Sequence, residues 1–250
     1  MNKFCADLHV HTVLSPCAEV EMIPPLIVQR AVELGIDLIA ITDHNASANV
    51  SAVQKAAAGS SLKVLAGMEV QTREEVHLLC LFDSAQQLEA WQASVDAALP
   101  DERNRPEFFG EQFVVDEYGD YIRTEPRLLL TSTRFSIDEV FERVTALGGL
   151  ALPAHVDRAA NGLFPTLGLV SEQWRLLGFE ISRHITPAKA RAAFPSIGNL
   201  PLIQSGDVHR LDEFAASTFF TLAERTVEEI CKALKGEGGR SVAVQSGADK

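Results

Sequence analysis

The sequence has few cysteines, and none of them form a CxxC pair. The four cysteines among the 250 residues are widely spaced, at Cys5, Cys17, Cys80 and Cys231. This spacing excludes a disulfide-rich scaffold and a thiolate zinc knuckle, and it is typical of free thiols in a reducing compartment. We expect the first, third and fourth cysteines to be buried as small apolar residues.

Basic residues are also scarce. The sequence has 22 Lys and Arg against 34 Asp and Glu, which gives a formal net charge of −12 at pH 7. A chain with this balance does not attract a polyanion over a broad surface. The charge therefore disfavours extended binding to nucleic acid or to an anionic membrane, and an anionic substrate would need local positive charge.

Long hydrophobic segments are missing. Apolar runs such as 38–41 and 128–130 are far shorter than the roughly 20 residues of a membrane span. The first residues contain neither an apolar stretch nor a cleavage site made of small residues, which predicts that the chain is not exported. We therefore expect a cytoplasmic protein without a membrane-spanning segment.

What the sequence does contain is a repeated alternation of short apolar runs and amphipathic segments. Hydrophobic residues make up 46% and charged residues 22%, as in ordinary globular chains. The apolar runs predict strands at 4–9, 38–42, 63–69, 77–82, 150–154, 178–181 and 202–205, with a further strand at 218–222. The amphipathic segments predict helices at 24–34, 49–58, 85–99, 137–147, 187–193 and 227–234. This alternation predicts an α/β fold with a largely parallel sheet.

One segment interrupts the alternation. Residues 100–127 are acidic and aromatic, with a turn at 118–120 between two strand-like stretches, and we expect an inserted loop or hairpin there. No repeat or long linker divides the remaining chain. We therefore predict a single domain over residues 1–235, followed by a flexible C-terminal tail at 236–250.

Histidines and carboxylates gather at the ends of the predicted strands. His9 and His11 are two residues apart on one strand, so both imidazoles project from the same face and can reach one cation. Asp207 and His209 repeat this spacing. Because strand ends converge on one rim of an alternating barrel, residues distant in the sequence can build a single site. The predicted metal ligands at these ends are His9, His11, His44, Glu69, His77, His155, Asp207 and His209.

His77 begins its predicted strand instead of ending it. If residues 71–76 form a short connection, the next strand runs back antiparallel and His77 lies near Glu69. Imidazole and carboxylate ligands without a thiolate cluster indicate Zn, Mn or Fe in a catalytic site, and so many ligands exceed the need of one ion. We predict two or three divalent metal ions. Asp7 and Asp43, which precede ligands, are expected to orient imidazoles or to cap the following turn.

The segments DLHVHT, ITDHN, GMEV, VH, PAH and GDVH occur in an order that resembles the PHP family, the polymerase and histidinol phosphatase phosphoesterases. The resemblance extends from about residue 7 to about residue 209. It implies a distorted seven-stranded β/α barrel, related to the TIM barrel, with a trinuclear metal cluster that hydrolyses phosphate esters. It also implies how the ligands are shared: His9, His11, Glu69 and Asp207 on one ion, Glu69, His77 and His155 on a second, and His44 and His209 on the third.

The third metal site departs from the family pattern. Many members have Ser-Asp-Gly after the HxH-Thr segment, and the aspartate completes the third site. This chain has Ser15, Pro16 and Cys17 there, and proline offers no side-chain ligand. Glu19 is the preferred substitute because of its hardness and charge, and Cys17 is the alternative if the ion is zinc.

The predicted reaction is hydrolysis by metal-activated water. Two ions can lower the pKa of a bridging water, hold the phosphoryl oxygens and stabilise the leaving oxygen. Asp207, His155 and His209 are the predicted catalytic residues, and either histidine would protonate the leaving group if it is not fully occupied as a ligand. The residues predicted to bind the substrate phosphate are Arg158, Arg183, His184 and Arg210.

We expect the substrate to be a small phosphorylated metabolite, such as a nucleotide, a sugar phosphate or an amino-alcohol phosphate. A nuclease or phosphodiesterase acting on nucleic acid ends is the alternative, although no basic track supports it. A third hypothesis is a metal-stabilised binding module without catalytic activity. The order of the ligands makes a metal-dependent amide hydrolase on a related barrel less favoured.

Overall fold

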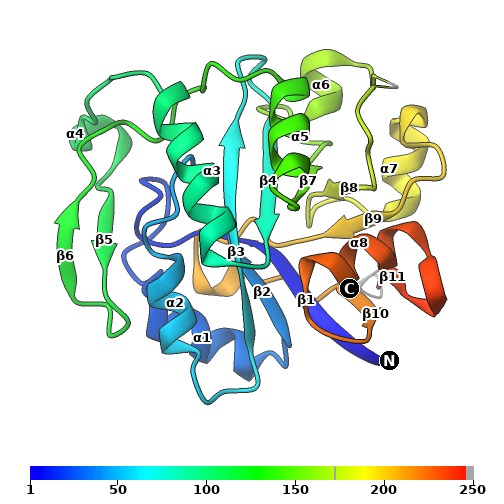
Figure 1. Cartoon of the computed structure of the whole chain (residues 1–250), viewed down its shortest axis with the longest axis horizontal. Coiled ribbons are helices and arrows are strands. Elements are labelled where there is room, and N and C mark those ends of the chain that lie inside the picture. The colour runs from blue at the N-terminus through cyan, green and yellow to red at the C-terminus, as the bar shows by residue number, and fades with distance from the viewer. Residues whose placement is uncertain (172, 246–250) are drawn as a thin grey trace.

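A curled sheet of seven strands forms the centre of the protein (Figure 1). The structure is a computed structural model that describes residues 1–171 and 173–245. The strands lie in the order β11 (Ser241–Val244), β10 (Thr218–Leu222), β1 (Asn2–Val10), β2 (Leu38–Ile41), β3 (Lys63–Gln71), β4 (His77–Phe82) and β7 (Leu150–Pro153). Two shorter pairs lie outside this sheet: β5 (Phe113–Val115) with β6 (Tyr121–Thr124), and β8 (Phe179–Ile181) with β9 (Leu202–Gln204).

Helices connect and cover the strands. They are α1 (Pro24–Glu33), α2 (Val50–Ala56), α3 (Ala85–Ala98), α4 (Pro106–Phe109), α5 (Ile137–Ala146), α6 (Leu163–Leu167), α7 (Pro187–Ala193) and α8 (Val227–Lys235). Short 3₁₀ turns occupy Pro195–Ile197, Leu211–Glu213 and Glu237–Gly239. Within the described residues, no helix combines the length and the apolar character of a membrane span.

The predicted distorted α/β barrel is confirmed, with the main sheet forming a curled half-barrel. The prediction of a largely parallel sheet is wrong for the main sheet, in which only the β1–β2 and β2–β3 pairs are parallel. Strand β4 runs antiparallel to β3 and β7, and β10 runs antiparallel to β1 and β11. The β8–β9 pair lies between β7 and β1 along the open side. On one side the amide of Val156 donates to the carbonyl of Glu180 at 2.9 Å, and on the other Val10 forms a parallel bridge with Val208. The strand ends that carry the site are thereby brought around one rim.

The sheet is buried on both faces, as the continuous apolar runs predict. In β2, Ile39 and Ile41 enter a cluster beneath α1, α2, α3 and α5, whereas Leu38 and Ala40 enter a second cluster that includes α8. All four residues are fully buried. Burial of both faces removes solvent from the interior of the sheet, so the polar groups at its rim must find partners within the protein.

The structure corrects the sequence-based expectation at the C-terminus. The predicted flexible tail at 236–250 is wrong for residues 237–245, because β11 pairs antiparallel with β10 and covers the edge of the sheet. A 3₁₀ turn at Glu237–Gly239 precedes this strand, and Gly238 and Gly239 both have positive φ there. Glycine therefore serves a tight turn here and does not mark a frayed end. Residues 246–250 lie outside the described residues.

The segment 100–127 contains α4 and the β5–β6 hairpin, with strands where the sequence predicts them. The hairpin is attached to the loop after β1, because the amide of Phe113 donates to the carbonyl of Val13 at 2.9 Å. The side-chain amide of Asn49 binds both the carbonyl of Phe113 (2.9 Å) and the amide of Val115 (3.0 Å). The hairpin therefore packs beside the loop that follows the first two histidines.

The return loop between β3 and β4 rests on the start of α5. The Ser136 hydroxyl accepts from the amide of Glu139, and the Glu139 carboxylate accepts from the amide of Ser136, which forms a capping box. The amide of Ile137 donates to the Glu74 carboxylate at 3.1 Å. Since β4 begins with His77, this helix end supports the loop that turns His77 back toward the rim.

The capping box gives a stability prediction. Replacing Ser136 with alanine should lower the free energy of unfolding by about 1 kcal/mol, because the Glu139 amide loses its acceptor. Ser94→Ala in α3, where the hydroxyl bonds only the Ala90 carbonyl of its own helix, is the matched control and should change stability by less than about 0.5 kcal/mol. Urea denaturation followed by circular dichroism measures both; equal effects would contradict the role of the cap.

Candidate metal centre

Six of the seven histidines and two carboxylates converge at the rim of the barrel. They come from β1, β3, β4 and the loops after β1, β2, β7 and β9. Six of these eight side chains are at least nine-tenths buried, whereas Asp207 and His209 keep 15% and 20% of their side-chain surface exposed. The eight residues are His9, His11, His44, Glu69, His77, His155, Asp207 and His209. The structure therefore brings together every predicted ligand except Glu19.

The antiparallel return predicted for β4 is confirmed. Gln71 of β3 pairs with His77 of β4, two residues beyond Glu69 on the same strand. As a result, Nδ1 of His77 lies 2.8 Å from Oε1 of Glu69. A parallel strand would have placed its first residue at the opposite end of the sheet.

The Glu69 carboxylate lies at the centre of the cluster. Its two oxygens face five imidazoles: Oε1 lies 2.8 Å from His77 Nδ1, 3.0 Å from His155 Nε2 and 3.3 Å from His9 Nε2, and Oε2 lies 2.9 Å from His44 Nδ1 and 3.4 Å from His11 Nε2. Glu69 is fully buried. A carboxylate with both oxygens shared in this way can bridge two cations.

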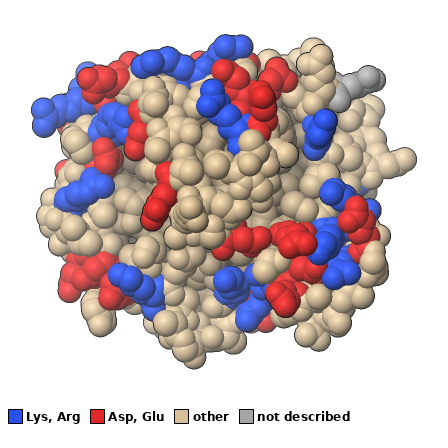
Figure 2. Space-filling view, in the orientation of Figure 1, with Lys and Arg blue, Asp and Glu red and all other residues tan. Residues whose placement is uncertain are grey.

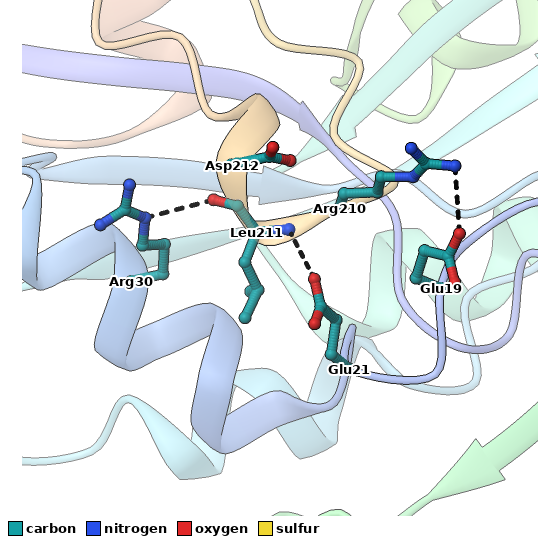
Figure 3. Close-up of a pocket in the computed structure, with 6 residues that line it drawn as sticks. All are labelled: Glu19, Glu21, Arg30, Arg210, Leu211 and Asp212. Carbon is teal, nitrogen blue, oxygen red and sulfur yellow. Dashed lines mark hydrogen bonds and ion pairs between the residues drawn. The ribbon is translucent and has the colours of Figure 1, made fainter.

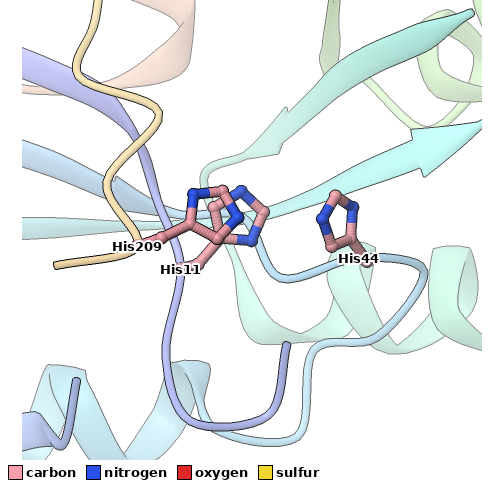
Figure 4. Close-up of side chains that lie close together, drawn as sticks. All are labelled: His11, His44 and His209. Carbon is pink, nitrogen blue, oxygen red and sulfur yellow. The ribbon is translucent and has the colours of Figure 1, made fainter. Parts of the chain in front are cut away.

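Three overlapping groups of side chains can each hold a metal ion. In each group the ligand atoms lie within 4.8 Å of one another. Figure 4 shows the third group, in which the imidazoles of His11 and His209 stack and that of His44 lies beside them. The groups are His9, His11, Glu69 and Asp207; His44, Glu69 and His77; and His11, His44 and His209.

The contacts inside the cluster fit bound cations. Nε2 of His9 and Nε2 of His11 lie 3.1 Å apart, and each also lies 3.3 Å from Oδ1 of Asp207. One proton cannot serve all of these short contacts. Among the described residues, Oε2 of Glu69 is a buried oxygen without a well-directed hydrogen bond, although His44 is near it. Divalent ions between the nitrogens and oxygens would satisfy both groups, and imidazole with carboxylate is a donor set that Zn, Mn and Fe accept.

The electrostatics keep Glu69 anionic and His11 neutral. Burial raises the pKa of Glu69, but His77, His9 and His44 outweigh it and hold the pKa well below its usual range. Burial lowers the pKa of His11, and the neighbouring His209 and His44 lower it further. A carboxylate and a neutral imidazole are the forms that bind metal ions. Burial lowers the pKa of His9 and of His44, but nearby anions, Glu69 among them, outweigh it and raise both pKa values, so these two imidazoles would release a proton when they bind a metal ion.

Asp43 and Asp7 hold the backbone around the cluster. Oδ1 of Asp43 accepts from the amide of Thr12 at 2.7 Å and from the hydroxyl of Ser15 at 2.7 Å. The Ser15 hydroxyl in turn contacts Nδ1 of His11 at 2.8 Å, so Asp43 both caps the turn and orients an imidazole. Asp7 instead accepts from backbone amides of the loop that carries Asp207 and His209, at Gly206 (3.1 Å) and Ala215 (2.7 Å).

Glu180 is a functional residue that the sequence interpretation missed. It lies in β8, is almost fully buried, and its Oε2 is 2.9 Å from Nδ1 of His9. The same oxygen accepts from the amide of His155 at 2.9 Å. The signal in the sequence is a lone carboxylate inside the predicted apolar strand 178–181, because a charge buried on such a strand needs a partner.

Two of the ligands have strained backbones. His155 and Asp207 have φ values of 27° and 49°, in the left-handed region that side chains other than glycine seldom adopt. The amide of His155 donates to the Glu180 carboxylate and the amide of Gly206 donates to the Asp7 carboxylate, and these hydrogen bonds hold the two conformations. Strain of this kind is typical of functional sites, where surrounding contacts maintain it.

The structure corrects the expectation that Glu19 completes the third site. Its side chain is half exposed, and Oε1 pairs with Nη2 of Arg210 at 3.1 Å, away from the histidines. Cys17 lies closer. Burial raises the pKa of its thiol, but the charges and hydrogen bonds of His44 and His209 outweigh burial and lower the pKa to about 6. The Cys17 thiol, and not the Glu19 carboxylate, is therefore the side chain of this turn that faces these imidazoles.

A cavity of about 460 Å³ opens beside the cluster, and we call it the mouth. Arg158 pairs with Oδ2 of Asp207. Arg183 donates to the carbonyl of Gly206 and to the Glu213 carboxylate, both at 2.8 Å. All four predicted substrate-binding residues line the mouth together with Cys17, Asp207 and His209: Arg158, Arg183, His184 and Arg210.

A second hollow of about 550 Å³ shares Arg210 with the mouth (Figure 3). Its polar groups are engaged with one another: Nε of Arg30 donates to the carbonyl of Leu211 at 3.2 Å, and the amide of Leu211 donates to Glu21 at 3.4 Å. Three carboxylates, those of Glu19, Glu21 and Asp212, line this hollow. It is larger than the mouth, but it contains no part of the histidine cluster.

The chain is similar to known proteins in sequence and in fold. The family model described as PHP domain matches residues 7–165. The 5′-3′ exoribonuclease Rnm of Salmonella typhimurium is 34% identical over 80 residues, which are 30% of this chain and 26% of the exoribonuclease. The chain thus spans about a quarter of that relative's length.

Two solved structures share the fold. The lesion-specific endonuclease PfuEndoQ of Pyrococcus furiosus has a TM-score of 0.72 at 20% identity, and the similarity covers 99% of this chain and 60% of the endonuclease. A putative metal-dependent phosphoesterase of Bifidobacterium adolescentis has a TM-score of 0.59 at 20% identity, covering 91% of this chain and 96% of that protein.

The contacts of Glu180 give a prediction for metal binding. Glu180→Ala leaves Nδ1 of His9 and the amide of His155 without their acceptor, so metal affinity should fall by about 10- to 100-fold. Titration of the metal-free protein with Zn²⁺ against a chromophoric chelator measures this. Glu89→Gln on the exposed face of α3 is the control and should bind as the parent does. Unchanged affinity in a folded Glu180→Ala variant would show that the His9 and His155 contacts do not support the ligands.

Proposed function

The chain belongs to the PHP domain family, a family of metal-dependent phosphoesterases, and on this basis we propose that it hydrolyses phosphate esters with metal-activated water. The observation that carries the proposal is the convergence of five imidazoles and two carboxylates in groups that can hold metal ions, with the imidazole of His155 beside Glu69, next to a cavity lined by arginines. The cluster supplies the ligands and the cavity supplies the positive charge that an anionic substrate needs in an acidic protein.

The proposed reaction divides the work between the cluster and the mouth. The ions, when bound, would supply hydroxide at neutral pH and hold the phosphoryl oxygens. Asp207, His155 and His209 would help to hold these ions. Arg158 and Arg183 place guanidinium groups beside Asp207, where they can bind the remaining phosphoryl oxygens. His184, the one histidine outside the cluster, lines the mouth and would protonate the leaving oxygen.

The dimensions and charge of the mouth favour a small phosphorylated substrate, such as a nucleotide, a sugar phosphate or an amino-alcohol phosphate. A volume of about 460 Å³ is in the range of small-molecule sites. On the face shown in Figure 2, lysine and arginine side chains are interspersed with aspartate and glutamate, and the described residues form no continuous basic track across that face. This mixed charge does not suit a long nucleic acid.

A nucleic acid end is the second candidate substrate. It is favoured by the similarity to the exoribonuclease and by the fold shared with the endonuclease. In this case the mouth would take only the terminal nucleotide. Binding of the adjoining phosphates would then have to come from exposed cations near the mouth, such as Arg210, whose side chain is 60% exposed.

Asp207→Asn tests the reaction. The substitution removes an anionic ligand, so turnover of a phosphodiester or phosphomonoester should fall on the order of 100-fold or more, while circular dichroism stays unchanged. Asp212→Asn, at an exposed position in the same loop, is the control and should retain activity. A parent protein that binds metal but hydrolyses no phosphate ester would support the silent binding module instead.

A substrate series tests the substrate class. We expect kcat/KM for a mononucleotide or a sugar phosphate to equal or exceed that for 5′-phosphorylated oligonucleotides of increasing length, with weak dependence on salt. An end-acting nuclease would show the reverse: kcat/KM rising with length and falling steeply as salt displaces phosphate contacts. Chelation of the metal ions should abolish either activity, and readdition should restore it.

A further inference from the structure

The turn that follows His11 carries Cys17 to the third group of histidines. The turn closes with a hydrogen bond from the amide of Ala18 to the carbonyl of Ser15 at 2.9 Å. The Ser15 hydroxyl contacts Nδ1 of His11 and also accepts from the amide of His44 at 3.2 Å. Beyond the turn, the amide of Glu19 donates to the carbonyl of His209 at 2.9 Å. The turn is thus attached to all three histidines of the group.

The inserted segment fixes this turn from the other side. Gly110, just after α4, lies against Pro16, so that a Cβ at residue 110 would be only 2.1 Å from the Pro16 carbonyl oxygen. Gly110 has a φ of 98°, and Asn104 donates to its carbonyl at 2.9 Å. Pro16 adds the fixed φ of its ring. The backbone before Cys17 is therefore constrained by close packing, and the thiol is held at the mouth.

The carboxylates that face the third group are shared with the other two: Glu69 lies 2.9 Å from His44, and Asp207 lies 3.5 Å from His209. The ring centroids of His11 and His44 lie 4.6 Å apart and those of His11 and His209 lie 4.1 Å apart, while the carboxylate of Glu19 is engaged with Arg210. The other two groups contain Glu69 or Asp207. Cys17 lines the mouth with His209, and the amide of Glu19, two residues further along the turn, donates to the His209 carbonyl. The Cys17 sulfur is therefore the further donor that this turn brings beside the group.

We propose that the Cys17 thiolate is a metal ligand that completes the third site with His44 and His209, and that this sulfur–nitrogen site selects zinc over manganese. The inference rests on the proposed function only in that both need a metal-binding cluster. When the S–Zn bond forms, the thiol loses its proton to solvent. Thiolate and imidazole favour zinc, whereas a carboxylate in the same place favours harder ions such as manganese.

Cobalt substitution tests the ligand directly. The metal-free protein is titrated with Co²⁺ in the absence of air, and the near-ultraviolet thiolate-to-cobalt charge-transfer band is recorded. We expect the band in the parent and in Cys231→Ser, a control at a partly buried cysteine in α8, and its loss in Cys17→Ser. Cys17→Asp should bind the third ion without the band, and should take Mn²⁺ more readily than the parent does. A band that persists in Cys17→Ser, or a parent with three bound ions and no band, would overturn the proposal.

Thiol alkylation gives an independent measurement. Because Cys17 is exposed and Cys5 and Cys80 are buried, iodoacetamide should modify Cys17 in the metal-free protein, as followed by peptide mass spectrometry. Three equivalents of Zn²⁺ should slow this modification at least about tenfold, as expected of a coordinated sulfur, whereas Mn²⁺ should not. Equal modification with and without Zn²⁺ would refute the sulfur ligand.

The two proposals can fail separately. Hydrolysis of phosphate esters without a charge-transfer band or thiol protection would refute the sulfur ligand and leave the proposed function standing. The band and the protection without hydrolysis would refute the function and leave the ligand standing. Elemental analysis of the zinc-loaded parent and of Cys17→Ser should give about three and about two ions per chain.

Discussion

The site depends on one buried carboxylate, that of Glu69, which faces five imidazoles from four different parts of the chain. An isolated buried anion is costly, and an isolated cluster of imidazoles is costly once any of them is protonated. Each group stabilises the other only if the strands converge. The antiparallel β4 is therefore a requirement of the chemistry, because it returns His77 to the strand that carries Glu69. Nε2 of His9 and Nε2 of His11 lie 3.1 Å apart, and a metal ion beside them would take the place of the proton that they would otherwise have to share.

Three further carboxylates, those of Glu180, Asp43 and Asp7, hold the predicted ligands and their backbone in position. Glu180 binds His9 and the backbone of His155, and Asp43 binds His11 through Ser15. Asp7 holds the loop that ends in Asp207 and His209. Because the two most strained ligands lie where these carboxylates bind backbone amides, the strain is offset locally. Some of the acidic residues that give the chain its net negative charge therefore belong to the site.

Much of the fold and most of the cluster followed from the sequence, since both depend on strand periodicity. The ends of the strands meet at one rim regardless of the loop conformations. The ligands between His9 and His209 could therefore be assigned to one site from the sequence alone. The strand β11 could not be predicted, because Gly238 and Gly239 serve a flexible tail and a tight turn equally well. Glu180 was missed for a different reason: its role depends on how β8 packs against His9, a contact between residues 171 positions apart.

The third site shows why ligand chemistry alone was not enough. The hardness and charge of the carboxylate favoured Glu19 over Cys17 as a metal ligand. That ranking did not consider the residues that compete with a metal ion for the same carboxylate. Arg210 lies beside Glu19 and pairs with it at the surface, where neither group has to lose much hydration. The turn that carries Cys17 is instead held beside His44 and His209 by its own hydrogen bonds and by the packing of Gly110 against Pro16. The Cys17 sulfur, a softer donor than a carboxylate oxygen, is therefore present beside the third group of histidines. Sulfur in place of oxygen at this position would change the ligand set of one ion, which shares His11 and His44 with the other two groups.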